Sequence, residues 1–311
     1  MKLGIVIPCF NEENNIIPLF QKLTSELVQY KKFILFIDDG STDNTLNVLR
    51  TLTEQNKDVY YLSFSRNFGH QKALKAGYDH IDADCVVSLD ADLQHPPELI
   101  HKMIAAWQEG FEVISSIRAD STKVSFMKRN TARIFYAVFN SVTTTKIHNN
   151  TADFRLIDRK VLLVIKDMKE DVLFFRALFP WLGFKHHNIE YQPNIRMYGQ
   201  TKYNMLKMLS LSLSGITSFS LSPLRISYLF GIFFSFISLI YATYAILIHF
   251  FTDQTVPGWT SILVCLLFIS GLQFIIIGVI GEYVGKTFME SKNRPPYVIS
   301  EQNFHKEENR M

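Results

Sequence analysis

The chain reads SLDADLQHP at residues 88–96, where a short apolar run ends in two carboxylates, Asp90 and Asp92. Carboxylate oxygens at the end of a buried strand suit Mg²⁺ or Mn²⁺, and such an ion commonly accompanies a phosphorylated partner. An Asp-X-Asp pair also occurs in many surface turns, so its meaning depends on what the rest of the chain places around it.

Apolar, β-branched runs alternate with segments of helical periodicity in the first part of the chain. Strands that alternate with helices at this spacing predict an α/β fold whose mostly parallel sheet is covered by helices on both faces. The expected strands are residues 2–8, 33–37, 59–64, 84–89 and 112–117, and the expected helices between them include residues 11–30, 71–80 and 97–107.

A polar cluster follows each of the five expected strands. Because ligands of such sheets bind at the carboxyl ends of strands, we expect these clusters to lie together at one edge of the sheet. Five independent surface turns would not be expected to coincide in this way. The clusters are Asn11 with Glu12, Asp38 with Asp39, Arg66 with Asn67, Asp90 with Asp92, and Arg118.

Several of these side chains fit two roles. Glu12 and Asp39 either accept hydrogen bonds from a nucleoside or cap local turns, as Asp commonly does. The basic residues between positions 118 and 133 either bind a second phosphate or form a solvated helix surface. The residues around Gly199 form either a lid or a linker.

Two stretches near the C-terminus, residues 226–251 and 261–280, contain no charged side chain. Each meets the length of about 20 residues that a helix needs to cross a bilayer. A buried helical hairpin is the alternative, although two such stretches in succession exceed what a domain core usually needs. Basic residues flank the pair on both outer sides, so the positive-inside rule places the N-terminal domain and the C-terminal tail in the cytoplasm.

Composition and missing motifs exclude several classes of protein. A net charge of +3 over 311 residues is too small to indicate a nucleic-acid partner. The sequence contains no Gly-X-Gly-X-X-Gly or Walker-type loop, which argues against a Rossmann dehydrogenase or a P-loop enzyme. No His or Cys pair has the spacing of a zinc site.

Four motifs in order resemble those of family 2 glycosyltransferases, which have the GT-A fold. They are VIPCFNEE at residues 6–13, DDGSTD at 38–43, SRNFGHQ at 65–71 and DADLQHP at 90–96. Together with the two apolar stretches, they make the chain similar to the polyprenyl-phosphate glycosyltransferases, whose relatives include dolichol-phosphate mannose synthase and the bacterial bactoprenol glucosyltransferases. The chain departs from that pattern at Phe10, Ala152 and Thr201, where relatives often carry Tyr, Gly and Ser.

The resemblance implies how a nucleotide sugar and a metal ion would be held. Asp90 would lie near the ribose and the diphosphate, and Asp92 and Gln94 would ligate Mg²⁺ or Mn²⁺. The residues that would hold the nucleoside are Pro8, Asn11, Glu12, Asp39 and Ser41.

The resemblance also implies an acceptor site. Arg118 and Arg129, with Thr131 nearby, would hold the acceptor's phosphate, and Asp153 would lie close to the sugar. Arg196 and Lys202 would belong to a donor-binding loop that closes over the nucleotide sugar. The catalytic group would then comprise Asp90, Asp92, Asp153 and Arg118.

The implied reaction is an inverting, metal-dependent transfer of a hexose, most simply glucose from UDP-glucose, to a polyprenyl phosphate such as undecaprenyl phosphate. The product would be a lipid-linked monosaccharide for cell-envelope glycosylation, made at the cytoplasmic face of the plasma or inner membrane. UDP-N-acetylglucosamine, UDP-galactose and GDP-mannose are alternative donors. Two other functions are alternatives: a processive polysaccharide synthase, whose usual Gln-X-X-Arg-Trp motif this sequence lacks, and a non-enzymatic nucleotide-binding scaffold.

The predicted organisation has four parts. Residues 1–200 form a cytoplasmic GT-A catalytic domain, and residues 201–223 form an amphipathic segment that lies either in the membrane interface or against the domain. Residues 224–285 form a two-helix transmembrane hairpin, and residues 286–311 form a cytoplasmic tail whose end, from residue 301, is polar and expected to be mobile. The resemblance also implies a tetramer.

Overall fold

The computed structural model describes residues 1–119, 150–170, 174–194, 217, 220–251 and 258–304. These residues belong to two compact units. An α/β unit contains the described residues up to 194 and those from 294 onward, and a helical unit contains the described residues between 217 and 293.

The α/β unit is built on a mixed sheet that has eight strands among the described residues, in the order β7-β5-β6-β4-β1-β2-β3-β8. The five strands expected from the sequence are confirmed as β1 to β5, and three further strands were not expected. The strands are β1 (Lys2–Cys9), β2 (Lys31–Asp38), β3 (Val59–Phe64), β4 (Cys85–Ser88), β5 (Val113–Arg118), β6 (Thr151–Asp158), β7 (His186–Tyr191) and β8 (Ile299–Gln302).

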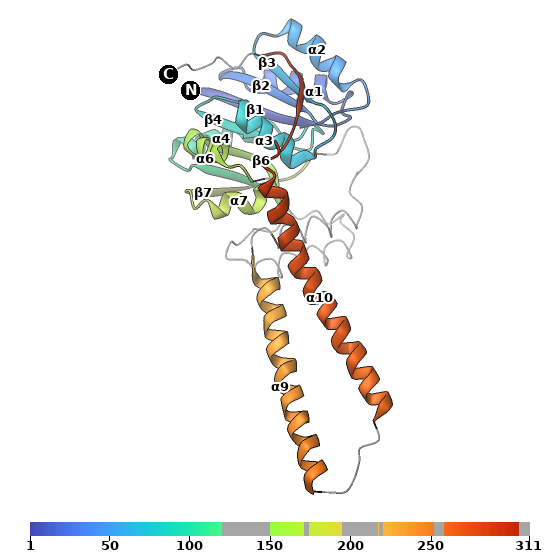
Figure 1. The fold of residues 1–311 in the computed structure, drawn as a ribbon. Helices are drawn as coiled ribbons and strands as arrows, with labels where there is room; N and C mark the ends of the chain where they lie inside the picture. The colour runs from blue at the N-terminus through green and yellow to red at the C-terminus, as the bar shows by residue number, and fades with distance from the viewer. Residues whose placement is uncertain (120–149, 171–173, 195–216, 218–219, 252–257, 305–311) are drawn as a thin grey trace, which may run out of the picture. The chain divides into compact units, whose positions relative to one another are not determined.

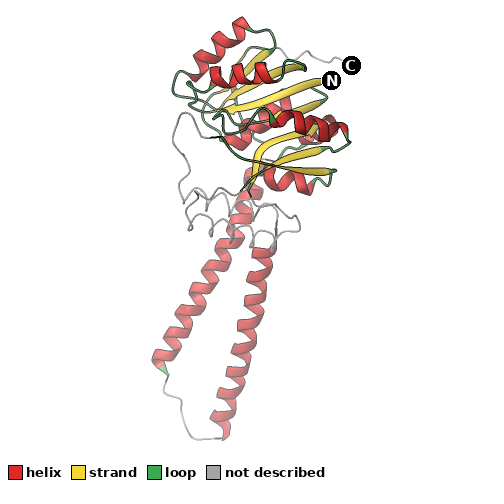
Figure 2. Ribbon diagram, turned by 180° about the vertical axis from the view of Figure 1, so that it is seen from behind, coloured by secondary structure: helices red, strands yellow, loops and turns green. Residues whose placement is uncertain are grey.

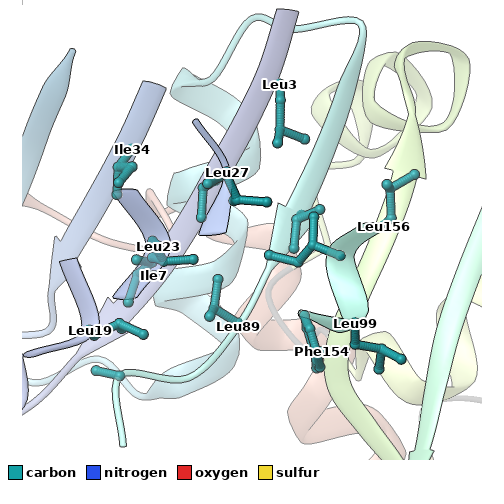
Figure 3. Close-up of a cluster of buried hydrophobic side chains, with 14 of the residues drawn as sticks. Leu3, Ile7, Leu19, Leu23, Leu27, Ile34, Leu89, Leu99, Phe154 and Leu156 are labelled. Carbon is teal, nitrogen blue, oxygen red and sulfur yellow. The ribbon is translucent and has the colours of Figure 1, made fainter. Parts of the chain in front are cut away.

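Helices cover both faces of this sheet (Figures 1 and 2). On one face, Leu3, Ile5 and Ile7 of β1 belong to the same buried cluster as the apolar sides of α1, α2 and α4. Figure 3 shows Leu3 and Ile7 in this cluster together with Leu19 and Leu23 of α1 and Leu99 of α4. On the other face α3 packs so closely on β1 that a Cβ atom on Gly77 would lie 2.2 Å from Val6. The helices are α1 (Ile16–Glu26), α2 (Thr45–Gln55), α3 (His70–His80), α4 (Leu99–Gln108), α6 (Arg159–Asp167) and α7 (Phe175–Trp181).

Strand directions decide which side chains share an edge of the sheet. β1 runs parallel to β2 and β4, and β2 runs parallel to β3. β6 lies between β4 and β5 and is antiparallel to both, so β4 and β5 point the same way. The carboxyl ends of β1 to β5 and the amino end of β6 therefore lie at one edge, which confirms the expected convergence and adds the start of β6 to it.

The first residues of the expected polar tail, from residue 301, belong to the α/β unit, so the expectation of mobility is wrong for residues 301–304. Ile299–Gln302 forms β8, an edge strand that pairs antiparallel with β3. Its side chains alternate between partly buried and exposed, because successive side chains of a strand point to opposite faces of the sheet. Residues 305–311 lie outside the described part of the chain.

The helical unit contains α9 (Ser222–Phe251) and α10 (Trp259–Ser291), which contain the two stretches expected to be apolar helices. Both are long and apolar enough to cross a membrane, with windows of mean hydropathy 1.7 and 1.6 at Ser222–Tyr241 and Phe268–Ser291. Large apolar side chains are exposed along both helices, including Phe236 and Phe274. Within the unit, the rings of Phe234 and Phe268 are in contact with centroids 5.8 Å apart, and the Tyr283 hydroxyl donates to the Ser220 carbonyl. The expected interfacial segment, residues 201–223, lies almost entirely outside the described residues.

Candidate active site

The loops after β1 and β2 are joined by reciprocal hydrogen bonds. The Asn11 N–H donates to Ser41 Oγ at 2.9 Å, and the Thr42 N–H donates to Asn11 Oδ1 at 2.8 Å. Asn11 adopts a left-handed φ of 55°, which Asn tolerates better than most residues. The Glu12 N–H donates to Thr45 Oγ1 at 2.9 Å, so Asn11, Glu12 and Ser41 lie together as expected. Pro8 is the second-last residue of β1 and pairs in register with Ile37 of β2.

Asp39 organises the neighbouring loop after β3. Its carboxylate accepts the N–H groups of Phe68 at 2.7 Å and Gly69 at 3.0 Å, and the side-chain amide of Asn67 at 3.0 Å. Burial raises the pKa of Asp39, and the two backbone donors oppose that shift. Of the two roles left open by the sequence, the structure shows the turn-stabilising one, and contact with a nucleoside stays a prediction.

A glycine allows this close approach of two loops. Gly40 has a φ of 67°, and a Cβ atom there would lie 2.3 Å from the carbonyl carbon of Arg66. No side chain fits between the two backbones, so the Asp39 turn and the loop after β3 form one tightly packed structure.

The loop after β4 places Asp90, Asp92 and Gln94 in a compact turn. The Asp90 N–H donates to His95 Nδ1 at 3.1 Å, and the Gln94 N–H donates to Asp92 Oδ1 at 3.1 Å. Leu93 has a φ of 63°, which closes the turn. Burial lowers the pKa of His95, so its ring is neutral and accepts the Asp90 N–H.

Arg118, at the end of β5, lies against this turn. Its guanidinium Nη2 donates to Gln94 Oε1 at 3.0 Å. The structure therefore brings together the residue expected to bind the acceptor's phosphate and a residue expected to ligate the metal. Four other expected site residues lie outside the described part of the chain: Arg129, Thr131, Arg196 and Lys202.

Asp153, at the start of β6, is buried and paired with an arginine that the sequence did not single out. Arg176 on α7 donates from Nη2 to Asp153 Oδ2 at 2.9 Å and from Nε to Oδ1 at 3.3 Å. Burial alone would raise the pKa of Asp153, but Arg176 and His70 outweigh it and lower the pKa. Asp153 is therefore ionised at neutral pH.

His70, the first residue of α3, connects the two carboxylates. Its Nε2 lies 2.8 Å from Asp90 Oδ1, and its Nδ1 lies 4.0 Å from Asp153 Oδ2. Burial would lower the pKa of His70, but Asp90 and Asp153 raise it to about 9, so the imidazole is a cation at neutral pH. Despite burial, the charge of His70 and its hydrogen bond lower the pKa of Asp90 and keep Asp90 ionised.

Sequence reasoning missed both His70 and Arg176 as site residues. His70 falls inside the SRNFGHQ motif, so position within a motif was a usable signal for it. Arg176 had none, because the short helix α7 contains Pro180 and its place beside β6 depends on tertiary contacts. One such contact comes from Arg155, a buried cation stacked 4.1 Å over Phe179 that also donates to the Phe175 carbonyl.

The oxygen donors at this edge fit a hard divalent cation. Among the described residues, no group of three or more His, Cys, Asp or Glu side chains forms a complete metal site. Asp92 and Gln94 nevertheless offer carboxylate and amide oxygens in one turn. Mg²⁺ in particular is commonly bound by one or two carboxylates together with substrate phosphates, so a partial protein site fits an ion that arrives with a diphosphate.

Comparison with known proteins identifies the family. The model of glycosyl transferase family 2 matches residues 4–165. The chain is 42% identical over 301 residues to the uncharacterized glycosyltransferase YkcC of Bacillus subtilis, covering 96% of this chain and 93% of that one. It is 41% identical over 302 residues to the prophage bactoprenol glucosyl transferase homolog of Escherichia coli and to the bactoprenol glucosyl transferase of Shigella phage SfV, covering 96% of this chain and 98% of each relative.

One match among solved structures is glucosyl-3-phosphoglycerate synthase from Mycobacterium tuberculosis, in complex with Mn²⁺, UDP and phosphoglyceric acid. It is 15% identical, with a TM-score of 0.47, and the match covers 71% of this chain and 78% of that one. The family match, and the relatives that are 41% and 42% identical over nearly the whole length, lead to one conclusion: the chain belongs to glycosyl transferase family 2 and is a glycosyltransferase with a GT-A-like α/β domain.

Proposed function

We propose that this glycosyltransferase transfers a hexose from a nucleotide sugar, most simply UDP-glucose, to a polyprenyl phosphate such as undecaprenyl phosphate. The observation that carries the proposal is the meeting of Asp90, Asp92, Gln94, Arg118 and Asp153 at one edge of the sheet. The bactoprenol glucosyl transferases that match over 96% of this chain support the lipid acceptor, and the two apolar helices support a membrane location.

The donor would lie across the ends of β1, β2 and β4. Pro8, Asn11, Glu12, Asp39 and Ser41 would surround the nucleoside, and Asp90 would lie near the ribose and diphosphate. Asp92 and Gln94 would hold Mg²⁺ or Mn²⁺, which when bound neutralises the diphosphate and makes it a better leaving group. Arg196 and Lys202 would close over the donor from the segment that precedes the helical unit.

The acceptor's phosphate would lie beside Arg118, with Arg129 and Thr131 as further contacts. Its oxygen attacks C1 of the sugar, the bond between C1 and the diphosphate oxygen breaks, and the anomeric configuration inverts. A phosphate monoester is largely dianionic near neutral pH, since its second pKa is about 6. It therefore needs positioning and charge neutralisation rather than a general base.

Asp153 and its partners would shape the space for the sugar. Asp153 is held ionised between His70 and Arg176, so it is an acceptor for a sugar hydroxyl. A fixed acceptor beside the reacting carbon would orient the hexose for in-line attack.

The membrane arrangement follows from the same reaction. α9 and α10 would cross the plasma or inner membrane as a hairpin, with the catalytic domain and the C-terminus in the cytoplasm, so that the site meets the lipid phosphate while the isoprenoid chain stays in the bilayer. A tetramer is part of the proposal by family resemblance.

Membranes that contain the protein, incubated with labelled nucleotide sugars, test this function. UDP-glucose, UDP-N-acetylglucosamine, UDP-galactose and GDP-mannose would each be supplied with undecaprenyl phosphate, and products would be separated by chloroform extraction. A chloroform-soluble monosaccharide supports the proposal and names the donor. A polymer would indicate a processive synthase, and no product from any donor would contradict the proposal.

A further inference from the structure

The chain that leaves α10 returns to the α/β unit and binds beside the loop that Asp39 organises. We propose that residues 297–303, the C-terminal strap, position the nucleoside-binding loop of the donor site, and that Tyr297 is the positioning residue. The inference rests on the proposed function, in which Asp39 and its neighbours hold the nucleoside.

The strap is joined to β3 through its backbone. Leu62 pairs with Gln302, and Phe64 pairs with Ile299, with a shift in register between Ser63 and Phe64. Beyond the end of β3, the Ser65 N–H donates to the Val298 carbonyl at 3.0 Å. The pairing therefore continues into the loop after β3, which is the loop that donates to Asp39.

Specific side-chain contacts also hold the strap. Arg50 on α2 donates from Nε to Glu301 Oε1 at 2.8 Å, and the Tyr61 hydroxyl donates to the same carboxylate. The side chain of Asn303 accepts the Tyr61 N–H at 2.7 Å. These contacts fix the register of the strap, so Tyr297 always meets the same part of β3.

Tyr297 packs against the end of β3. Its ring stacks on Phe64 with centroids 5.2 Å apart and an interplanar angle of 16°. Its hydroxyl donates to Asp79 Oδ2 on α3 at 2.9 Å. Tyr297 thereby connects β3 to α3, the two elements between which the Asp39-binding loop runs.

From Phe64 the contacts lead directly to Asp39. Phe64 packs edge to face against Phe68, with centroids 5.6 Å apart, and the Arg66 guanidinium lies 4.0 Å from the centre of the Phe68 ring. The backbone N–H of Phe68 donates to Asp39 at 2.7 Å. Loss of the Tyr297 ring would leave Phe64 without its stacking partner and loosen Phe68, so the Asp39 loop would no longer be fixed for the nucleoside.

The consequence is that a segment after the apolar helices contributes to donor binding. A C-terminal substitution far from every donor motif in the sequence would therefore lower the affinity for the nucleotide and leave binding of the acceptor's phosphate unchanged.

Titration of the purified full-length chain with UDP and Mn²⁺ tests the inference. Because Tyr297→Ala removes a stacked aromatic ring, we expect it to raise the Kd for UDP about 3- to 10-fold. In a transfer assay, the same substitution should change the KM for polyprenyl phosphate by less than about twofold. Tyr297→Phe keeps the ring and should restore nearly full UDP affinity. Val298→Ala is the matched control, because that side chain is exposed and its carbonyl remains.

Hydrogen exchange keeps the inference testable if Tyr297→Ala lowers the stability of the whole chain. The amides of Phe68 and Gly69 should exchange faster in Tyr297→Ala than in Tyr297→Phe, by more than the amides in the middle of β1. Equal exchange at Phe68 and Gly69 in both variants, or an unchanged Kd for UDP in a folded Tyr297→Ala, would overturn the inference.

Asp39→Asn separates this failure from failure of the proposed function. If Asp39→Asn weakens UDP binding and Tyr297→Ala does not, only the role of the strap is wrong. If Asp39→Asn leaves the Kd for UDP unchanged, the assignment of the nucleoside site to the Asp39 loop is wrong, and the inference about the strap fails with it.

Discussion

His70 Nε2 lies 2.8 Å from Asp90 Oδ1, which places a cation from α3 against the first carboxylate of the DADLQ turn. The same imidazole lies 4.0 Å from Asp153 on β6. The His70 cation lowers the pKa of both the half-exposed Asp90 and the buried Asp153, and together with Arg176 it keeps both carboxylates ionised at one edge of the sheet.

Replacement of His70 tests this charge arrangement. We expect His70→Ala to lower kcat by about 10- to 100-fold, because a preorganised charge at the site is lost. His70→Gln, which keeps a hydrogen-bond donor without the charge, should fall between the wild type and His70→Ala. His101→Gln is the control, since His101 lies on α4 and contacts Tyr30. Equal rates for the wild type and His70→Ala would show that His70 has no role in the reaction.

Asp92 tests the metal role. Asp92→Ala should abolish transfer while circular dichroism and the Tm remain close to those of the wild type, and EDTA should abolish transfer by the wild type. Asp82→Ala serves as the control, because Asp82 is exposed and paired with Arg159. Full transfer in the presence of EDTA would rule out the proposed metal dependence.

Arg118 tests the acceptor's phosphate site. Arg118→Ala should raise the KM for polyprenyl phosphate by about 10-fold or more, since a charged hydrogen bond to phosphate is lost, and raise the KM for the nucleotide sugar much less. Arg159→Ala is a matched control, as that arginine follows the other end of β6. An equal rise in both KM values would argue against the assignment of Arg118 to the acceptor.

Alanine substitutions at two glycines with positive φ distinguish the cost of backbone strain from the cost of a steric clash between loops. Gly40 and Gly110 have φ values of 67° and 92°, but a new Cβ meets the Arg66 backbone only at Gly40 and open space at Gly110. We expect Gly40→Ala to lower the free energy of unfolding by about 1–3 kcal/mol more than Gly110→Ala, because the loops must move apart. Chemical denaturation measures both, and equal losses would contradict the close packing of Gly40 against the Arg66 backbone.

Glu301 gives the strap a pH dependence. The hydrogen bonds from Arg50 and Tyr61 lower the pKa of Glu301 from its usual value near 4.5 to about 2. A lowered carboxylate pKa stabilises the folded strap fully above about pH 4.5, and this contribution is lost as the pH falls towards 2. Hydrogen exchange of β8 amides should therefore accelerate over that window in the wild type. The same acceleration in Glu301→Gln would show that another group is responsible.

The sequence predicted the part of the site that lies at the ends of strands. Asp90, Asp92 and Arg118 follow apolar runs directly, so the direction of the strands was enough to bring them together. Asp153 was predicted as a site residue only from the family resemblance. Its strand, β6, is antiparallel and lies between β4 and β5, and the alternation of strands and helices along the chain does not reveal this order.

The remaining parts depend on tertiary contacts that have no local pattern. Arg176 reaches Asp153 from a seven-residue helix, which is too short for a clear period. β8 has the polar sequence ISEQ and is held by backbone pairing and by Arg50, which lies 251 residues away from Glu301 in the sequence. Such contacts form only in the folded chain, so no local sequence pattern predicts them.

Transfer of label from UDP-glucose to lipid tests the central claim most directly. Purified full-length protein would be incubated with labelled UDP-glucose and Mg²⁺ or Mn²⁺, with and without undecaprenyl phosphate, and the label in the chloroform phase would be counted. We predict label in a lipid-linked monosaccharide that appears only with undecaprenyl phosphate and is absent with Asp92→Ala. Label that stays in the aqueous phase, or that enters a polymer without the lipid phosphate, would contradict the account.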